Sequence, residues 1–354
     1  MKKVAVICNY PLFPDRIGGM DRFFWSFDKK CKEINFQVDW YFSDFAAYEG
    51  YKNLKVLSSN QQKMESFFIH QIKLNNLKYD FVITHFLELC TPFFKEIKSI
   101  HPSKIICVDH NPRPLDGFPI KKRIKNYLKG ILYSKYIDQF IGVSKYTKKH
   151  ILSDYGFFLE HKTKVIYNGI DTSVFLKREK KNKNCFYVAS HLRESKGIQD
   201  LLEALNLLKI DVRNQIQIDI YGEGPIENQL KNTTKKYNLS EIVHFKGSSS
   251  KLNELACHYN FLLQPTYMEC FSLSILESLA ANVPVITTTV GGNLEIITNN
   301  ENGFIFEPKN SQHLSEILTG IVLGNLKIDK KVNFLIEEEF NLDKMVDNYL
   351  ALFS

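Results

Sequence analysis

The stretch QPTYMECFSLSILESLAANVPVITTTVGGNLE, residues 264–295, decides the fold. It begins where the apolar run Phe261–Gln264 ends, passes through a loop into a run of helix-forming residues at 272–281, and reaches a second apolar run, Val283–Thr287. The order strand, loop, helix, strand predicts a βαβ unit with two parallel strands. Ser272 stands where an N-cap is expected, so the first N–H groups of the helix form a potential anion site.

The same alternation extends outward over the whole chain and predicts an α/β fold. We expect two tandem Rossmann-like domains, 1–166 and 167–339, each a doubly wound parallel sheet that binds ligands at the carboxyl ends of its strands, with a cleft between them. A final helix at 340–354 packs back on the first domain, and the charge run 177–184 is the linker candidate. The other strands are expected at Lys3–Cys8, Val38–Phe42, Phe81–Thr84, Ile105–Val108, Phe140–Val143, Cys185–Ala189, Ile216–Tyr221 and Val243–Phe245.

Composition excludes several classes of protein. The 354 residues contain no uninterrupted apolar run of about 18, which a membrane-spanning helix requires. The first apolar stretch, Val4–Cys8, is shorter than the core of a signal peptide, so we expect a cytoplasmic protein. Seven scattered cysteines without a CxxC pair argue against structural zinc and a disulfide framework.

Charge is distributed unevenly along the chain. Residues 1–165 carry 27 basic and 16 acidic side chains, whereas residues 166–354 carry 19 and 23. The basic half is expected to meet an anionic partner, and no nucleic acid is expected. Within it, 120–135 predicts an amphipathic helix with six cations and no acid between Asp116 and Asp138. Such a helix either lies on an anionic membrane or packs on the core with a solvated basic face.

Two glutamates in the stretch 264–295 are candidates for binding a ligand. Glu269 lies in the loop after the strand, and Glu277 lies inside the helix about two turns further on. A diphosphate at the helix N-terminus would leave Glu277 able to accept hydrogen bonds from a ribose. The spacing alone is weak, because one loop glutamate and one exposed helix glutamate also occur by chance.

The surrounding residues make the pattern specific. Pro265, the two glutamates, SLAAN at 278–282 and GGNLE at 291–295 closely resemble the nucleotide-sugar-binding segment of glycosyltransferase family 4, the retaining enzymes of the GT-B fold. The resemblance extends over nearly the whole chain, through GG at 18–19, VS at 143–144, NGID at 168–171, KG at 196–197 and YGEGP at 221–225.

The resemblance implies a division of labour between the domains. The second domain binds a nucleotide-sugar donor, the first binds the acceptor, and no metal or other cofactor is expected. The family places an Arg five residues before the Lys-Gly pair. Here Lys196 matches, but the Arg position holds His191, so either His191 or Arg193 would join Lys196 in neutralising the diphosphate in place of a metal.

The implied site residues fall into three groups. Catalytic roles are expected for His110, Glu269 and Lys196, and His85 is a weaker acceptor-side candidate. Gly18 and Gly19 are expected to take positive φ and to approach the donor closely. A structural loop histidine remains the alternative for His110, and a plain strand–helix turn remains the alternative for 222–224. The donor-binding set comprises Gly18, Gly19, His191, Arg193, Lys196, Gly222, Glu223, Phe271, Ser272, Leu273 and Glu277.

The expected activity is transfer of a hexose or N-acetylhexosamine, most simply from a UDP-sugar, to a glycan or to a polyprenyl- or lipid-linked glycan. The expected role is synthesis of a bacterial surface polysaccharide such as lipopolysaccharide. Two alternatives remain at this stage: a nucleotide-sugar 2-epimerase, and a non-catalytic nucleotide-sugar-binding subunit. If helix 120–135 binds a membrane, the protein is peripheral on its inner face.

Overall fold

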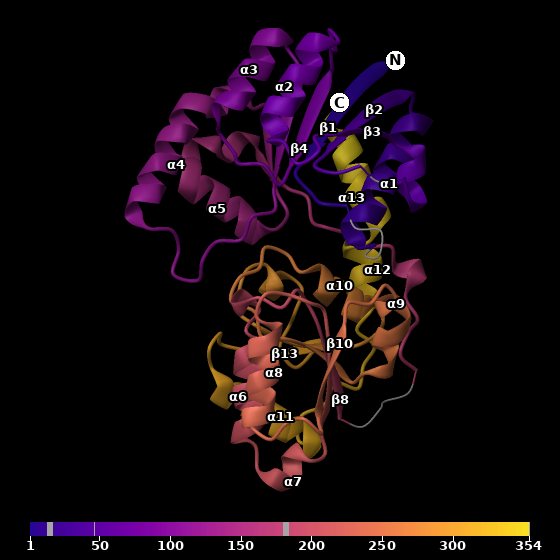
Figure 1. Cartoon of the computed structure of the whole chain (residues 1–354), viewed down its shortest axis with the longest axis vertical. Helices are drawn as coiled ribbons and strands as arrows, with labels where there is room; N and C mark the ends of the chain where they lie inside the picture. Colours follow the sequence, from indigo (N-terminus) through magenta and orange to yellow (C-terminus); the bar gives the residue numbers. More distant parts are fainter. Residues whose placement is uncertain (13–16, 46, 180–183, 354) are drawn as a thin grey trace. The chain divides into compact units, whose positions relative to one another are not determined.

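The computed structural model describes residues 1–12, 17–45, 47–179 and 184–353. It contains two compact units (Figure 1). Unit 1 comprises Met1–Asn168 and Leu342–Ser354, and unit 2 comprises Gly169–Asn341. The sequence-based boundaries, 166/167 and 339/340, lie two residues from these divisions.

Unit 1 is built on a seven-stranded parallel sheet in the order β3-β2-β1-β4-β5-β6-β7. The order reverses between β1 and β4, which makes their carboxyl ends the switch point where such sheets bind ligands. The strands are β1 (Lys2–Cys8), β2 (Phe36–Phe42), β3 (Lys55–Ser58), β4 (Phe81–His85), β5 (Lys104–Asp109), β6 (Gln139–Gly142) and β7 (Thr163–Val165).

Helices cover both faces of this sheet because neighbouring strand residues point to opposite sides. Tyr41 contacts Phe68 of α2 (Met64–Leu74), with ring centroids 4.8 Å apart. The adjacent Trp40 contacts Phe24 of α1 (Gly19–Glu33) at 5.2 Å on the other face. The face with α2 also receives α3 (Pro92–Ile100) and α5 (Lys145–Tyr155), and the face with α1 receives α13 (Leu342–Leu350).

The C-terminal helix therefore belongs to unit 1, although the chain reaches it only after unit 2. Tyr349 of α13 is fully buried, and its ring lies 4.9 Å from that of Phe23. The remaining helix of the unit, α4 (Ile120–Tyr133), packs on α5 rather than on the sheet (Figure 1). A short 3-10 turn, Ser134–Tyr136, follows α4.

Unit 2 repeats the arrangement with six parallel strands in the order β10-β9-β8-β11-β12-β13, which reverses between β8 and β11. Its strands are β8 (Cys185–Ala189), β9 (Gln217–Tyr221), β10 (Val243–Gly247), β11 (Phe261–Gln264), β12 (Val285–Thr288) and β13 (Gly303–Phe306). Its helices are α6 (Ile198–Leu207), α7 (Ile210–Arg213), α8 (Glu227–Lys236), α9 (Leu252–Leu255), α10 (Leu273–Ala280), α11 (Ser311–Val322) and α12 (Phe334–Glu339).

The α/β fold class is confirmed, and each expected strand lies within two residues of an observed one. The strands β3, β7 and β13 were not predicted. They are three or four residues long, and β3 and β7 carry lysines, so their apolar signal is weak.

The linker prediction at 177–184 is wrong for the residues that the structure describes. The chain passes from unit 1 to unit 2 earlier, at Asn168–Gly169, and residues 180–183 lie outside the described residues. Arg178 is buried in unit 2, where its guanidinium donates to the Asn260 carbonyl at 2.9 Å and its backbone N–H donates to the Ala281 carbonyl. The sequence shows only that Arg178 is charged. It does not reveal that the guanidinium is buried and donates a hydrogen bond to a buried carbonyl.

Candidate functional site

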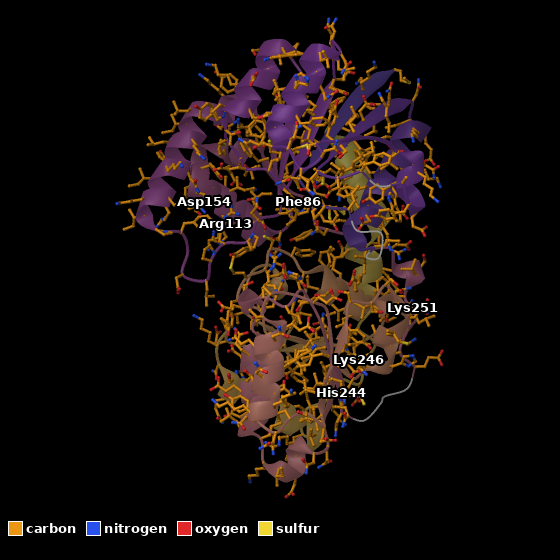
Figure 2. All side chains as sticks on the ribbon, in the orientation of Figure 1. Phe86, Arg113, Asp154, His244, Lys246 and Lys251 are labelled. Atoms are coloured by element: carbon orange, nitrogen blue, oxygen red, sulfur yellow. The ribbon has the colours of Figure 1, made fainter. Side chains whose placement is uncertain are left out.

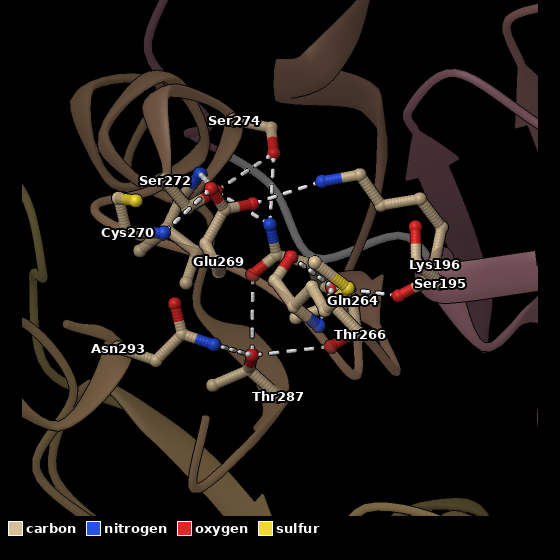
Figure 3. A network of polar contacts seen from close by, with 12 residues as sticks. Ser195, Lys196, Gln264, Thr266, Glu269, Cys270, Ser272, Ser274, Thr287 and Asn293 are labelled. Carbon is tan, nitrogen blue, oxygen red and sulfur yellow. Dashed lines mark hydrogen bonds and ion pairs between the residues drawn. The ribbon is translucent and has the colours of Figure 1, made fainter. Parts of the chain in front are cut away.

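The switch point of unit 2 brings two of the predicted site residues together. The loop after β8 carries Lys196, and the loop after β11 carries Glu269. Their side chains form an ion pair with Nζ 2.9 Å from Oε2, about four-fifths shielded from solvent (Figure 3). The second oxygen of Glu269 accepts a hydrogen bond from the Cys270 N–H at 3.2 Å. A partly shielded cation is thus held at the edge where doubly wound sheets bind anions.

Two glycines allow the loops to approach this closely. Gly197 has φ +67°, and a Cβ there would lie 1.8 Å from the Pro265 carbonyl oxygen. Gly291 has φ +68°, and a Cβ there would lie 2.1 Å from the Glu269 carbonyl oxygen. Only glycine combines this backbone conformation with such contacts. The predicted Lys-Gly and Gly-Gly pairs therefore position the ion pair.

A buried polar network fixes the N-terminus of α10 beside that ion pair (Figure 3). Ser272 is the N-cap, and its hydroxyl accepts from the Ile275 N–H at 3.3 Å, as the sequence predicts. Gln264 at the end of β11 donates to the hydroxyls of Ser272 and Ser274 and accepts from Thr287. Asn293 in turn donates to Thr287 at 3.0 Å.

Gln264, Thr287 and Asn293 were missed by sequence reasoning. Each is at most 4% exposed; Gln264 contacts the cap residue Ser272, Thr287 donates to Gln264, and Asn293 donates to Thr287. The available signal was a glutamine at the end of the apolar run FLLQ and an asparagine after the Gly291–Gly292 pair. With its cap held this way, α10 presents the partial positive charge of its first turn at a fixed place.

Glu277 lies in the second turn of α10 and is only half-buried. Its carboxylate acts on Tyr187 of the neighbouring strand β8: burial raises the pKa of Tyr187, a hydrogen bond with Ser278 opposes the rise, and the charge of Glu277 adds to it. The side chain of Phe271 is buried against Phe340, with ring centroids 5.3 Å apart, so a ligand at this turn meets the Phe271 backbone rather than its ring. Leu273 remains half-exposed at the first helical position.

The remaining predicted donor residues lie on two loops that pair with each other. The Leu192 N–H donates to the Glu223 carbonyl at 2.9 Å, and the Ser190 N–H donates to the Tyr221 carbonyl at 3.1 Å. Gly222 has φ +126°, and a Cβ there would lie 1.9 Å from the Ser190 carbonyl oxygen. Contact between the loops therefore accounts for this glycine without a ligand. His191 is half-buried, and Arg193 and Glu223 are exposed.

In unit 1, the Gly18–Gly19 pair begins α1, but the predicted positive φ is wrong. Gly18 is the N-cap with φ −111° and ψ −175°, and Gly19 is the first helical residue. The cause is Asp21, whose carboxylate accepts from the Gly18 N–H at 2.8 Å and from the Tyr51 hydroxyl at 2.6 Å. Burial raises the pKa of Asp21 and outweighs these hydrogen bonds. Among the described residues, a Cβ on Gly18 would come within 4 Å of Asp21 alone, at 3.6 Å.

Unit 1 also joins the two predicted histidines. His85 ends β4 and His110 follows β5, so neighbouring parallel strands deliver both to one sheet edge. His85 Nδ1 lies 2.9 Å from His110 Nε2. Burial lowers the pKa of His110 to about 4 and, with a contribution from His110, lowers the pKa of His85. Both imidazoles are therefore neutral at pH 7, and one nitrogen of the pair donates while the other accepts.

Phe86, the residue after β4, contacts this pair at His110. Its ring stacks on His110 with centroids 4.3 Å apart. Its φ of +59° is an unfavourable backbone conformation for a bulky residue, and such strain persists only where the surroundings enforce it.

A buried arginine holds the loop that carries His110, and sequence reasoning missed it. Arg113 donates to Asp109 and Asp154, each at 2.8 Å, and to the Asn111 carbonyl. Figure 2 labels Arg113 and Asp154 in unit 1. Burial opposes the charge of Arg113, but the two carboxylates outweigh it and raise the pKa. The signal available in VDHNPRP was an acid and an arginine four residues apart; the third partner, Asp154, is remote in the sequence.

No group of three or more His, Cys, Asp or Glu side chains in the described ranges is arranged to hold a metal ion. Among the helices that the structure describes, none is long and apolar enough to cross a membrane.

Comparison with known proteins identifies the family. The model of the glycosyl transferases group 1 matches residues 170–338, and that of Glycosyltransferase Family 4 matches residues 17–174. The two matches together extend over nearly the whole chain, one on each unit. The chain belongs to the glycosyltransferases of the GT-B fold and the family 4 type, which confirms the resemblance found in the sequence.

Relatives agree with this assignment. The chain is 28% identical over 204 residues to an uncharacterized glycosyltransferase, MJ1178, of Methanocaldococcus jannaschii; the match spans 56% of this chain but only 55% of that relative. It is 25% identical over 263 residues to the O-antigen biosynthesis glycosyltransferase WclY of Escherichia coli, with 70% of each chain covered. The Anabaena protein Alr3699/HepE, crystallised with UDP-glucose, superposes with a TM-score of 0.77 at 16% identity, covering 99% of this chain and 100% of that one.

Proposed function

We propose that this chain is a retaining glycosyltransferase that moves a hexose or N-acetylhexosamine from a UDP-sugar to a glycan or lipid-linked glycan in bacterial surface polysaccharide synthesis. The observation that carries the proposal is the ion pair between Lys196 and Glu269 beside the capped N-terminus of α10. The crystallised complex of HepE with UDP-glucose supports the donor, and the O-antigen role of WclY supports the pathway.

The donor diphosphate binds between Lys196 and the first turn of α10. Without ligand, Glu269 neutralises Lys196 at 2.9 Å; a diphosphate brings its own negative charge and takes over this cation. The N–H groups of the first turn and the lysine then stabilise the charge that grows on the leaving UDP. Glu277, one turn further along α10, accepts hydrogen bonds from the ribose hydroxyls.

The acceptor binds on the His85–His110 edge of unit 1. Because its pKa is lowered to about 4, His110 is neutral at pH 7 and can orient a hydroxyl without repelling the cationic character that develops at the sugar. The bond from the anomeric carbon to the diphosphate oxygen breaks, and a bond to the acceptor oxygen forms on the same face. The proton of the acceptor passes to the leaving diphosphate.

Calorimetric titration with UDP tests the donor site. We expect Lys196→Ala and Glu277→Ala each to weaken UDP binding by about 10- to 100-fold, because each removes a charge-assisted hydrogen bond of about 1.5–3 kcal/mol. The exposed residues Lys209 and Glu241 of unit 2 provide matched controls as Lys209→Ala and Glu241→Ala, which should leave the affinity unchanged. Equal UDP affinity in all five proteins would contradict the assignment.

A panel of GDP, ADP and CDP in the same titration identifies the base. Preference for a nucleotide other than UDP would replace the proposed donor while retaining the diphosphate site. Release of UDP together with a free 2-epimeric sugar, and no transfer to any acceptor, would indicate an epimerase instead.

A further inference from the structure

The helix α4 turns its apolar side away from the protein. Only Asn126 and Gly130 of this helix are buried. A Cβ on Gly130 would lie 1.9 Å from the Tyr155 carbonyl oxygen, so the small residues let α4 approach the end of α5 closely. Six large apolar residues of the helix are 48–73% exposed: Ile120, Ile124, Tyr127, Leu128, Ile131 and Leu132.

These six residues form one continuous stripe, which we call the α4 stripe. At 100° per residue, its members Ile124 and Leu128 lie about opposite Asn126 and Gly130 on the helix. The sequence left open whether the apolar side of this helix packs on the core with the basic side solvated. The structure excludes that alternative, because the side of α4 that packs on the protein is the one with the small residues.

Cations border the α4 stripe. Lys121 and Lys125 follow one edge and Arg123 follows the other, and all three are exposed. Lys122 lies over the ring of Phe118 at 3.5 Å, and Lys129 pairs with Glu88. No acidic residue occurs from 117 to 137. An exposed aliphatic centre between basic borders matches the interface of an anionic bilayer, where the aliphatic groups enter the acyl boundary and the lysines reach the headgroups.

We propose that the α4 stripe docks this protein on an anionic lipid bilayer, with the helix lying parallel to the membrane surface. The 14 residues of α4 suit this orientation, since they are too few to span a bilayer. A second copy of the chain fits the surface less well. Pairing two stripes would bring like-charged borders together, and lysine is depleted in protein interfaces.

This docking places the bilayer near the acceptor edge of unit 1. The loop that leaves β5 at His110 reaches α4 at Ile120, so the helix begins on the side of the sheet where His85 and His110 lie. We infer that the acceptor is lipid-linked and is taken from the membrane surface. This inference about the acceptor rests on the proposed function. Binding to vesicles does not itself depend on the donor site.

Vesicle flotation of the whole protein tests the proposal. We expect the wild type to float with phosphatidylcholine vesicles that contain phosphatidylglycerol and not with phosphatidylcholine alone. Lys121→Gln with Lys125→Gln should lower the partition coefficient about 25-fold, at about fivefold for each cation lost near an anionic surface. The exposed Lys235 and Lys236 of α8 serve as the matched control, since Lys235→Gln with Lys236→Gln should change nothing.

Insertion of the stripe is measured separately from electrostatic attraction. A tryptophan at position 128 (Leu128→Trp) should be quenched by brominated acyl chains, whereas one at the even more exposed position 74 on α2 (Leu74→Trp) should not. Leu128→Ser with Ile124→Ser should abolish flotation even at low salt.

Three results would overturn the proposal: no flotation of the wild type at low salt, equal binding of the Lys121/Lys125 variant, or no quenching at position 128. A dimer in analytical ultracentrifugation that Leu128→Ser dissociates would assign the α4 stripe to a second copy instead. Unchanged UDP affinity in the stripe variants separates this outcome from failure of the proposed function, because the donor residues lie in unit 2.

Discussion

Acidification should destabilise unit 1 through the buried histidine pair. The pKa of His110 is lowered to about 4 and that of His85 is lowered as well, whereas an unfolded histidine titrates near 6.5. Below pH 6.5, His85 and His110 therefore bind protons in the unfolded chain but stay unprotonated in the folded unit until the pH falls to their lowered pKa values. The free energy of unfolding falls as the pH drops from 7 toward 4, and the loss is complete below the folded pKa.

The size of the effect follows from the shift. At pH 5, about 1.5 pH units below the unfolded pKa, His110 alone costs about 2 kcal/mol relative to neutral pH, at 1.36 kcal/mol per unit. His85 adds a loss of the same sign. The stability of unit 1 should thus fall by at least about 2 kcal/mol between pH 7 and pH 5.

Tryptophan fluorescence during urea unfolding measures this in unit 1 specifically, because both tryptophans of the chain, Trp25 and Trp40, lie there. The comparison protein is His85→Asn with His110→Gln, whose amides can keep a hydrogen bond at the Nδ1 and Nε2 positions without titrating. Subtracting the stability loss of the variant from that of the wild type cancels the contributions of the other titrating groups. These include His150, because burial lowers its pKa as well. If the variant loses as much stability as the wild type between pH 7 and pH 5, the pair is not held neutral and the reasoning is wrong.

Three further predictions concern other parts of the account. Gly222→Ala should destabilise unit 2 by at least about 2 kcal/mol, since its Cβ would meet the Ser190 carbonyl, whereas Gly324→Ala, with φ +78° and open space, should cost about 1 kcal/mol; circular dichroism during thermal unfolding compares them. Arg113→Met should destabilise unit 1 by about 3–5 kcal/mol by leaving Asp109 and Asp154 buried without their cation, whereas the exposed Arg123→Met should stay within about 0.5 kcal/mol by tryptophan fluorescence. Transfer should proceed at an unchanged rate in EDTA, because Lys196 and α10 hold the diphosphate, and a loss that Mg²⁺ or Mn²⁺ restores would refute this.

The sequence predicted the elements whose signal is local. Buried strands such as Phe261–Gln264 read as short apolar runs, and Ser272 reads as an N-cap because capping is decided within three residues. The family pattern predicted Lys196 and Glu269 as site residues, but their ion pair was not predicted and emerges only from the structure. The short strands at the sheet margins lacked such a signal, because lysines on β3 and β7 dilute the apolar run.

The parts that sequence reasoning missed depend on long-range contacts. Asp154 lies 41 residues from Arg113, and Thr287 lies 23 residues from Gln264. A local sequence pattern therefore cannot predict either of these hydrogen bonds. The positive φ expected at Gly18–Gly19 failed because the carboxylate of Asp21, three residues on, holds Gly18 extended. The orientation of α4 was undetermined because periodicity reveals an apolar stripe without revealing what it faces.

The central claim is that unit 2 activates a UDP-sugar through Lys196, and turnover of the donor tests it most directly. UDP release is followed with UDP-glucose, UDP-galactose and UDP-N-acetylglucosamine, each in the presence of vesicles loaded with bacterial lipid extract. The account predicts UDP release from at least one donor with equal transfer of sugar into the lipid fraction, in the anomeric configuration of the donor, and a loss of at least tenfold in Lys196→Ala but not in Lys209→Ala. A wild-type protein that releases no UDP from any of the three donors, or a Lys196→Ala variant as active as the wild type, would contradict it.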